Sequence, residues 1–103
     1  MAQLIGIEVH SFSMEEGLDN IKSDYVEDIR TKTIQILYRF SGYINLDAIK
    51  IFYATGKTFN TIQNGVRKDQ IQLAKVIFSD GSSIYTSIYD LEKIILLSSD
   101  RVN

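Results

Sequence analysis

The chain has 103 residues, 45% of them hydrophobic and 23% charged, and a formal net charge of −2, which is the composition of a single globular domain over residues 1–103. It has no cysteine and one histidine, His10, which excludes disulfides, zinc–thiolate sites and multi-histidine metal centres. No apolar run approaches the ~18 residues of a membrane span, so we expect a cytoplasmic protein with no membrane segment. We also expect no cofactor.

The first elements predicted along the chain are a strand and a helix. Residues 3–12 alternate apolar and polar side chains from Ile5 onward, which is typical of a strand that leaves His10 half-exposed. Ser13 and Glu16 then fit a capping box at a helix start. Apolar residues follow at steps of three or four: Met14, Leu18, Ile21, Tyr25 and Ile29. This spacing predicts one longer acidic helix after the first strand.

Four dipeptides in which glycine follows a polar residue divide the rest of the chain. They are Ser41-Gly42, Thr55-Gly56, Asn64-Gly65 and Asp80-Gly81. Such pairs supply the positive φ of tight turns, and the segments between them are rich in Ile, Tyr, Phe and Thr. The pattern predicts an antiparallel meander of five or six strands. Residues 43–55 also fit a helix capped by Asn45, but β-branched and aromatic residues favour a strand.

The C-terminal part of the chain predicts a loop, a hairpin and a short helix. Residues 63–70 form the longest polar stretch and are predicted to be a surface loop or a twisted hairpin tip. Residues 71–78 and 83–88 are predicted to form a hairpin around a two-residue turn. Ser87–Asp90 resembles a second capping box, followed by a short helix that ends near Ser98. The predicted fold class is therefore α+β.

The predicted hairpin supplies an argument for a protein partner. Both of its faces are apolar, whereas a half-solvated antiparallel sheet normally alternates. An uncovered apolar face normally marks an interface, so we expect the protein to form a homodimer or to bind another protein. The residues expected at this interface are Tyr85, Phe78, Val76 and Tyr53.

A nucleic-acid-binding module is the alternative function. Residues 31–79 hold seven basic and two acidic side chains, whereas residues 1–30 hold two basic and seven acidic ones. The residues expected to contact nucleic acid lie on the central sheet and in the 63–70 loop: Lys50, Lys57, Phe59, Arg67, Lys68 and Lys75. A sequence pI near 5.3 is, however, the wrong sign for non-specific attraction of phosphate by the whole domain.

No catalytic motif stands out in the sequence. It contains neither a G-x-S-x-G elbow nor a Walker-type or dinucleotide-binding glycine pattern, and no calcium loop. We therefore expect no catalytic residue and no metal ligand. The sequence predicts a small non-enzymatic regulatory or accessory protein, of a kind common in bacteria and phages, that acts through protein–protein contact.

Overall fold

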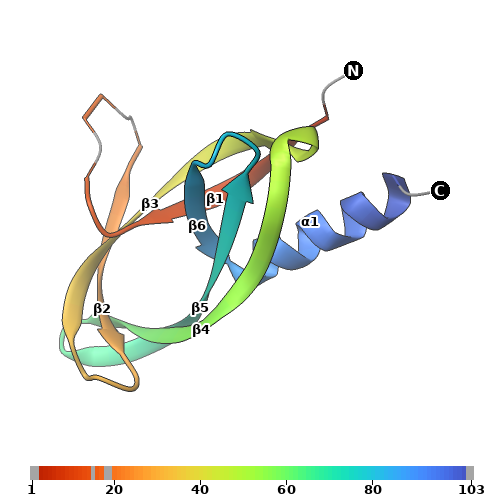
Figure 1. Ribbon diagram of the computed structural model, residues 1–103. Helices are drawn as coiled ribbons and strands as arrows, with labels where there is room; N and C mark the ends of the chain where they lie inside the picture. The colour runs from red at the N-terminus through yellow and green to blue at the C-terminus, as the bar shows by residue number, and fades with distance from the viewer. Residues whose placement is uncertain (1–2, 15, 18–19, 102–103) are drawn as a thin grey trace.

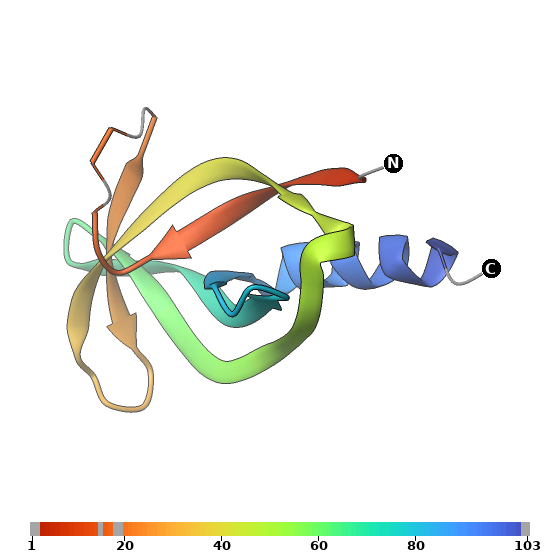
Figure 2. The same ribbon diagram turned by 45° about the horizontal axis from the view of Figure 1, so that its top comes forward.

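The computed structural model describes residues 3–14, 16–17 and 20–101, within which it has six strands, one turn of 3₁₀-helix and one α-helix (Figures 1 and 2). The elements are β1 (Leu4–Ser11), β2 (Lys22–Asp28), β3 (Ile34–Asn45), the 3₁₀ turn (Leu46–Ala48), β4 (Ile49–Gln63), β5 (Val66–Phe78), β6 (Ser83–Ser87) and α1 (Ile88–Arg101).

The strands form a closed antiparallel barrel in the order β1-β3-β2-β4-β5-β6. The predicted meander is wrong, because β2 lies between β3 and β4 rather than between β1 and β3. The register pairs Tyr25 of β2 with Ile36 of β3 on one side and with Ile62 of β4 on the other. As a result, β1 pairs with β3 along its whole length instead of with its neighbour in sequence.

The predicted acidic helix after the first strand is also wrong. Residues 16–17 form a turn, residues 22–28 are strand β2, and Leu18 of the predicted stripe lies outside the described residues. In β2 Val26 is fully buried and Glu27 is also buried, whereas Tyr25, a member of the predicted apolar stripe, is 61% exposed. Pairing with strands on both sides satisfies the backbone of this segment, and this long-range gain outweighs a helical spacing with no packed face.

The remaining predictions are partly confirmed. Asn45 does cap a helical turn, since its Oδ1 accepts from the Asp47 backbone N–H at 3.0 Å, but that turn spans only three residues before β4 begins. Of the two predictions for residues 63–70, the surface loop is wrong and the hairpin tip is confirmed. The segment contains a tight turn at Asn64 and Gly65, with φ of 53° and 78°, and β5 starts at Val66. Two successive positive φ values match the twist of the long β4–β5 hairpin.

The core consists of two clusters. The first contains Ile44 of β3 and Val76 of β5 and is covered by Ile94 of α1; the second contains Leu37 of β3 and Leu73 of β5. Side chains an odd number of residues apart point to opposite faces of a strand. Long strands β3 and β5 therefore bury one face at one end and the opposite face at the other.

The predicted C-terminal helix is confirmed. The Ser87 hydroxyl accepts from the Asp90 backbone N–H at 3.2 Å, which gives the helix the expected N-terminal cap. Helix α1 ends at Arg101, slightly beyond the predicted end. It packs one side on the first core cluster through Ile94, which is fully buried, and Leu97. This helix lies against one end of the barrel (Figure 1) and covers the first core cluster there.

Candidate functional site

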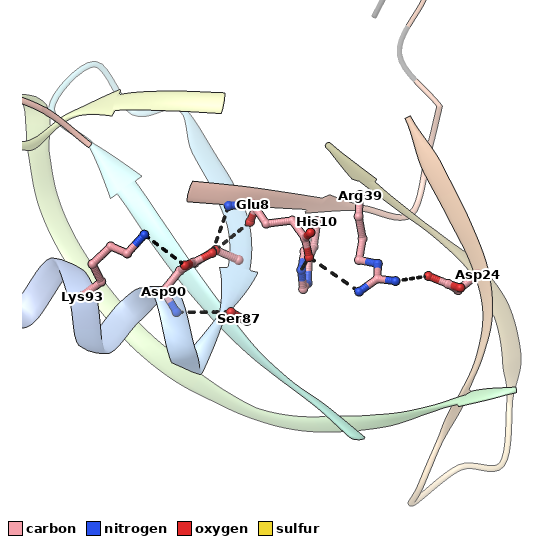
Figure 3. A network of polar contacts seen from close by, with 8 residues as sticks. Glu8, His10, Asp24, Arg39, Ser87, Asp90 and Lys93 are labelled. Atoms are coloured by element: carbon pink, nitrogen blue, oxygen red, sulfur yellow. Dashed lines mark hydrogen bonds and ion pairs between the residues drawn. The ribbon is translucent and has the colours of Figure 1, made fainter. Parts of the chain in front are cut away.

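The barrel closes at a seam between β1 and β6 that has a single register pair, His10 with Tyr85. Beyond this pair, side chains replace the missing strand. The Glu8 backbone N–H donates to Asp90 Oδ2 at 2.9 Å, and the Glu8 carbonyl accepts from the Thr86 hydroxyl at 2.8 Å (Figure 3). A side chain from the first turn of α1 and one from β6 thus satisfy the backbone groups of Glu8 at the edge of β1.

A network of polar side chains extends from this seam toward β3 and β2 (Figure 3). His10 Nε2 lies 3.2 Å from Glu8 Oε1, and Arg39 Nη1 lies 3.6 Å from the same oxygen. The guanidinium of Arg39 also donates to Asp24. The network therefore links β1, β3 and β2, and the Arg39 guanidinium lies between the carboxylates of Glu8 and Asp24.

His10 is 3% exposed, so its predicted half-exposed position is wrong. Its Nε2 donates to the Glu8 carboxylate, which can only accept; Nδ1 is buried without a hydrogen-bond partner among the described residues. Burial lowers the pKa of His10, more than the hydrogen bond and charge of Glu8 raise it. The imidazole is therefore neutral near pH 7, and its basic nitrogen faces the protein interior.

This geometry does not support acid–base catalysis by His10. A general base must reach the substrate with its unprotonated nitrogen, and that nitrogen is sealed from solvent. The adjacent Ser87 hydroxyl already caps α1.

An open pocket of about 390 Å³ does lie beside the seam, lined by Glu8, His10, Arg39, Gln70, Ile71, Gln72, Ser87, Ile88, Tyr89 and Glu92. Within the part of the chain described, no three metal-ligating side chains come together.

The buried histidine predicts how stability depends on pH. Its pKa is lowered below 6.5 in the folded state, so the unfolded chain binds the proton more readily. The free energy of unfolding should therefore fall as the pH is lowered from about 7.5 to 5.5. Urea denaturation at both values measures this fall, which should be smaller in His10→Gln. An equal fall in both proteins would assign the dependence to other groups.

A continuous row of apolar side chains lies elsewhere, on the outer side of β3, β2 and β4. The register places Ile36, Tyr25 and Ile62 side by side across the three strands, and Ile34 lies one step along β3 on the same side. Tyr25 is 61% and Ile34 59% exposed; Ile36 is exposed and Ile62 half-buried. We call these four residues the tyrosine–isoleucine face.

One ion pair borders the tyrosine–isoleucine face. Arg67 of β5 pairs with Ile62, and its Nε donates to Glu27 Oε1 of β2 at 2.9 Å, so the arginine side chain crosses β4. This hydrogen bond lowers the pKa of Glu27 and raises that of Arg67. Glu27 is buried, whereas the Arg67 side chain is 61% exposed. The pair fixes a cation at the edge of the apolar face.

The structure separates the residues predicted for a protein interface. Val76 is fully buried and Phe78 packs on the first core cluster, so neither lies on a free surface. The hairpin turn spans residues 79–82 rather than two residues, so Tyr85 pairs with Lys75 and points away from Val76. Tyr53 and Tyr85 do share a face, with Lys75 between them and its Nζ 5.5 Å from the Tyr85 ring centroid. Val76 and Phe78 are thus covered within one chain, whereas Tyr53 is exposed.

The residues predicted to bind nucleic acid are also dispersed. Phe59 is 3% exposed and packs against Phe12, so it offers no ring face to a base. Arg67 and Lys68 lie beside the β4–β5 turn, whereas Lys75 lies toward the far end of β5. The other basic residues are Lys57 at the middle of β4 and Lys50 at its start. The five basic residues of this set therefore form no compact basic surface.

Sequence reasoning missed the tyrosine–isoleucine face because Tyr25 was assigned to a helix. The signal was present in β3, where Ile34 and Ile36 alternate with Gln35 and Leu37. This pattern places apolar residues on both sides of the strand, and Leu37 is the one that the core takes. The helix assignment removed β2, and with it the neighbour that makes the outer side continuous.

No helix in the described residues has the length and apolar character needed to cross a membrane. Comparisons with protein-family models, curated proteins and solved structures find no match for this chain.

Proposed function

We propose that this chain is a small non-enzymatic accessory or regulatory protein that binds another protein molecule through the tyrosine–isoleucine face. The observation that carries the proposal is the row Ile36–Tyr25–Ile62, which is apolar across three adjacent strands and lies on the outside of the barrel. A contiguous exposed apolar surface of this kind normally marks an interaction site.

The energetics of the face support binding. Fully burying a side chain of the size of isoleucine stabilises a complex by about 1.5–3 kcal/mol. Tyrosine adds a large ring with few rotatable bonds and a hydroxyl for the polar rim, which is why it is enriched at interfaces. The strands that carry Tyr25 and Ile36 are held on their other side by the fully buried Val26 and Leu37. The face is therefore presented on a rigid support.

The distribution of charge favours a protein partner over nucleic acid. Binding to phosphates needs basic side chains gathered on one surface. The charge of Arg67 is balanced by Glu27, Lys75 lies over the Tyr85 ring, and Lys57 lies beside Asp28 and contributes to the lowered pKa of that carboxyl. Three of the expected phosphate contacts thus already have internal partners.

Photo-crosslinking tests the proposal. A benzophenone amino acid placed at Tyr25, in the cells that naturally express the chain, should give a protein adduct in high yield. The matched control is the same substitution at Tyr43, which is 79% exposed and lies outside the tyrosine–isoleucine face. Equal yields at both positions, or no adduct at Tyr25, would contradict the proposal. An adduct with a second copy and an adduct with a different protein both support it.

A further inference from the structure

We infer that the partner on the tyrosine–isoleucine face is a second copy of this chain, an inference that rests on the proposed function. The first argument is charge. The two adjacent cross-strand rows are Ile36–Tyr25–Ile62–Arg67 and Ile34–Glu27–Asn60–Gln70. These two rows hold one acid and one base and therefore carry no net charge. A copy of the same face is therefore not repelled, as it would be by a strongly acidic or basic surface.

The second argument is the position of the ion pair. A two-fold contact requires that whenever one residue touches another, the reverse contact also occurs. A two-fold axis running along β2 places Tyr25 against Tyr25 and Glu27 against Glu27, with the Arg67 partner of each carboxylate beside the other. Each guanidinium then lies close to two carboxylates.

The hydrogen-bonding capacity of Arg67 fits this arrangement. Arginine has five N–H donors in a fixed planar fork, and the bond to Glu27 within the chain uses Nε. The exposed guanidinium, on a side chain 61% exposed, keeps donors for a second carboxylate. The buried Glu27 carboxylate would gain a second cation at a site that contact with the other copy removes from water. The ion pair would then set the orientation of the dimer while the apolar residues supply most of its affinity.

The test is sedimentation equilibrium of the wild-type chain and of two charge-reversal variants, Glu27→Arg and Arg67→Glu. The wild type should dimerise, with little dependence on salt because apolar burial dominates. Each reversal places like charges together at the contact and should raise the dimer dissociation constant by roughly tenfold or more. Lys68→Glu, the matched control on the neighbouring residue, changes the net charge equally and should leave the constant within about twofold.

An equimolar mixture of the two variants gives the decisive result. One copy then presents two bases and the other two acids, so opposite charges meet only across the interface. Native mass spectrometry should show a heterodimer between the two variants in preference to either homodimer. The doubly reversed chain, Glu27→Arg/Arg67→Glu, should dimerise like the wild type.

The outcomes that overturn the inference are distinct from those that overturn the proposed function. A wild-type chain that stays monomeric, or a dimer whose constant neither reversal changes, excludes this contact between copies. A crosslink from Tyr25 to a different protein would in that case leave the proposed function intact. If a reversal at the buried Glu27 prevents folding, as judged by circular dichroism, Tyr25→Ser at an exposed position carries the same test. It should abolish dimerisation without changing the fold.

Discussion

Ile94→Ala should lower the free energy of unfolding by about 2–5 kcal/mol, the range for deleting a buried isoleucine side chain. Ile94 is fully buried and attaches α1 to the first core cluster, beside Ile7 and Val76. The truncation leaves a cavity between the helix and the strands, which neither can fill without moving. Urea denaturation followed by circular dichroism measures the change.

The control for this variant is Leu96→Ala. Leu96 lies two residues further along the same helix and is 68% exposed, so its truncation should change stability by no more than about 0.5 kcal/mol. Equal effects of the two substitutions would show that α1 does not pack on the barrel as described. An unchanged stability in Ile94→Ala would contradict the first core cluster itself.

Asp90→Ala should lower the free energy of unfolding by about 1–3 kcal/mol, because it leaves the backbone N–H of Glu8 without its acceptor. The Asp90 carboxylate accepts from the Glu8 backbone N–H at 2.9 Å and lies 3.3 Å from the Thr86 hydroxyl. Asp90 is 6% exposed and Thr86 is fully buried, so water does not readily replace the lost acceptor. Chemical denaturation measures the loss, and amide exchange at Glu8 should accelerate with it.

Two further variants separate the hydrogen bonds of Asp90 from its charge. Asp90→Asn keeps one side-chain oxygen as acceptor and should lose less than half as much stability as Asp90→Ala. Glu92→Ala removes an exposed acid from the same helix turn and should leave stability within about 0.5 kcal/mol. If Asp90→Asn is as damaging as Asp90→Ala, the negative charge at the helix start matters more than the seam.

The sequence was sufficient to predict those elements whose pattern lies within a few consecutive residues. Alternation from Ile5 predicts β1, Asp80-Gly81 predicts the β5–β6 hairpin, and Ser87 with Asp90 predicts the start of α1. It was insufficient for residues 13–29. The spacing of Ile21, Tyr25 and Ile29 is that of a helix, but the same spacing can also arise by chance in a strand. Strand β2 is stabilised by pairing with β3 and β4, which no window of consecutive residues reveals.

For the candidate site, the sequence predicts that an apolar contact surface exists but not which residues form it. Apolar residues on both sides of the predicted sheet suggested a contact surface, but burial assigns them differently. Val76 belongs to one core and Leu73 to the other, whereas Tyr25 and Ile36 are left outside. The choice depends on which end of a long strand each core takes. That choice follows from the path of the strands through the barrel and not from their composition.

The seam has a consequence for the order in which the protein folds. Strand β1 is joined to β6 and α1, which follow it at a long distance in sequence, and the second core cluster also joins β2 with β5. During synthesis the barrel therefore cannot close until β6 and α1 have left the ribosome. Contacts so distant in sequence slow folding, since a long loop must be ordered before they form. Until then the unpaired edge of β1 stays available to other chains, and nascent copies are most exposed to misassembly at this stage.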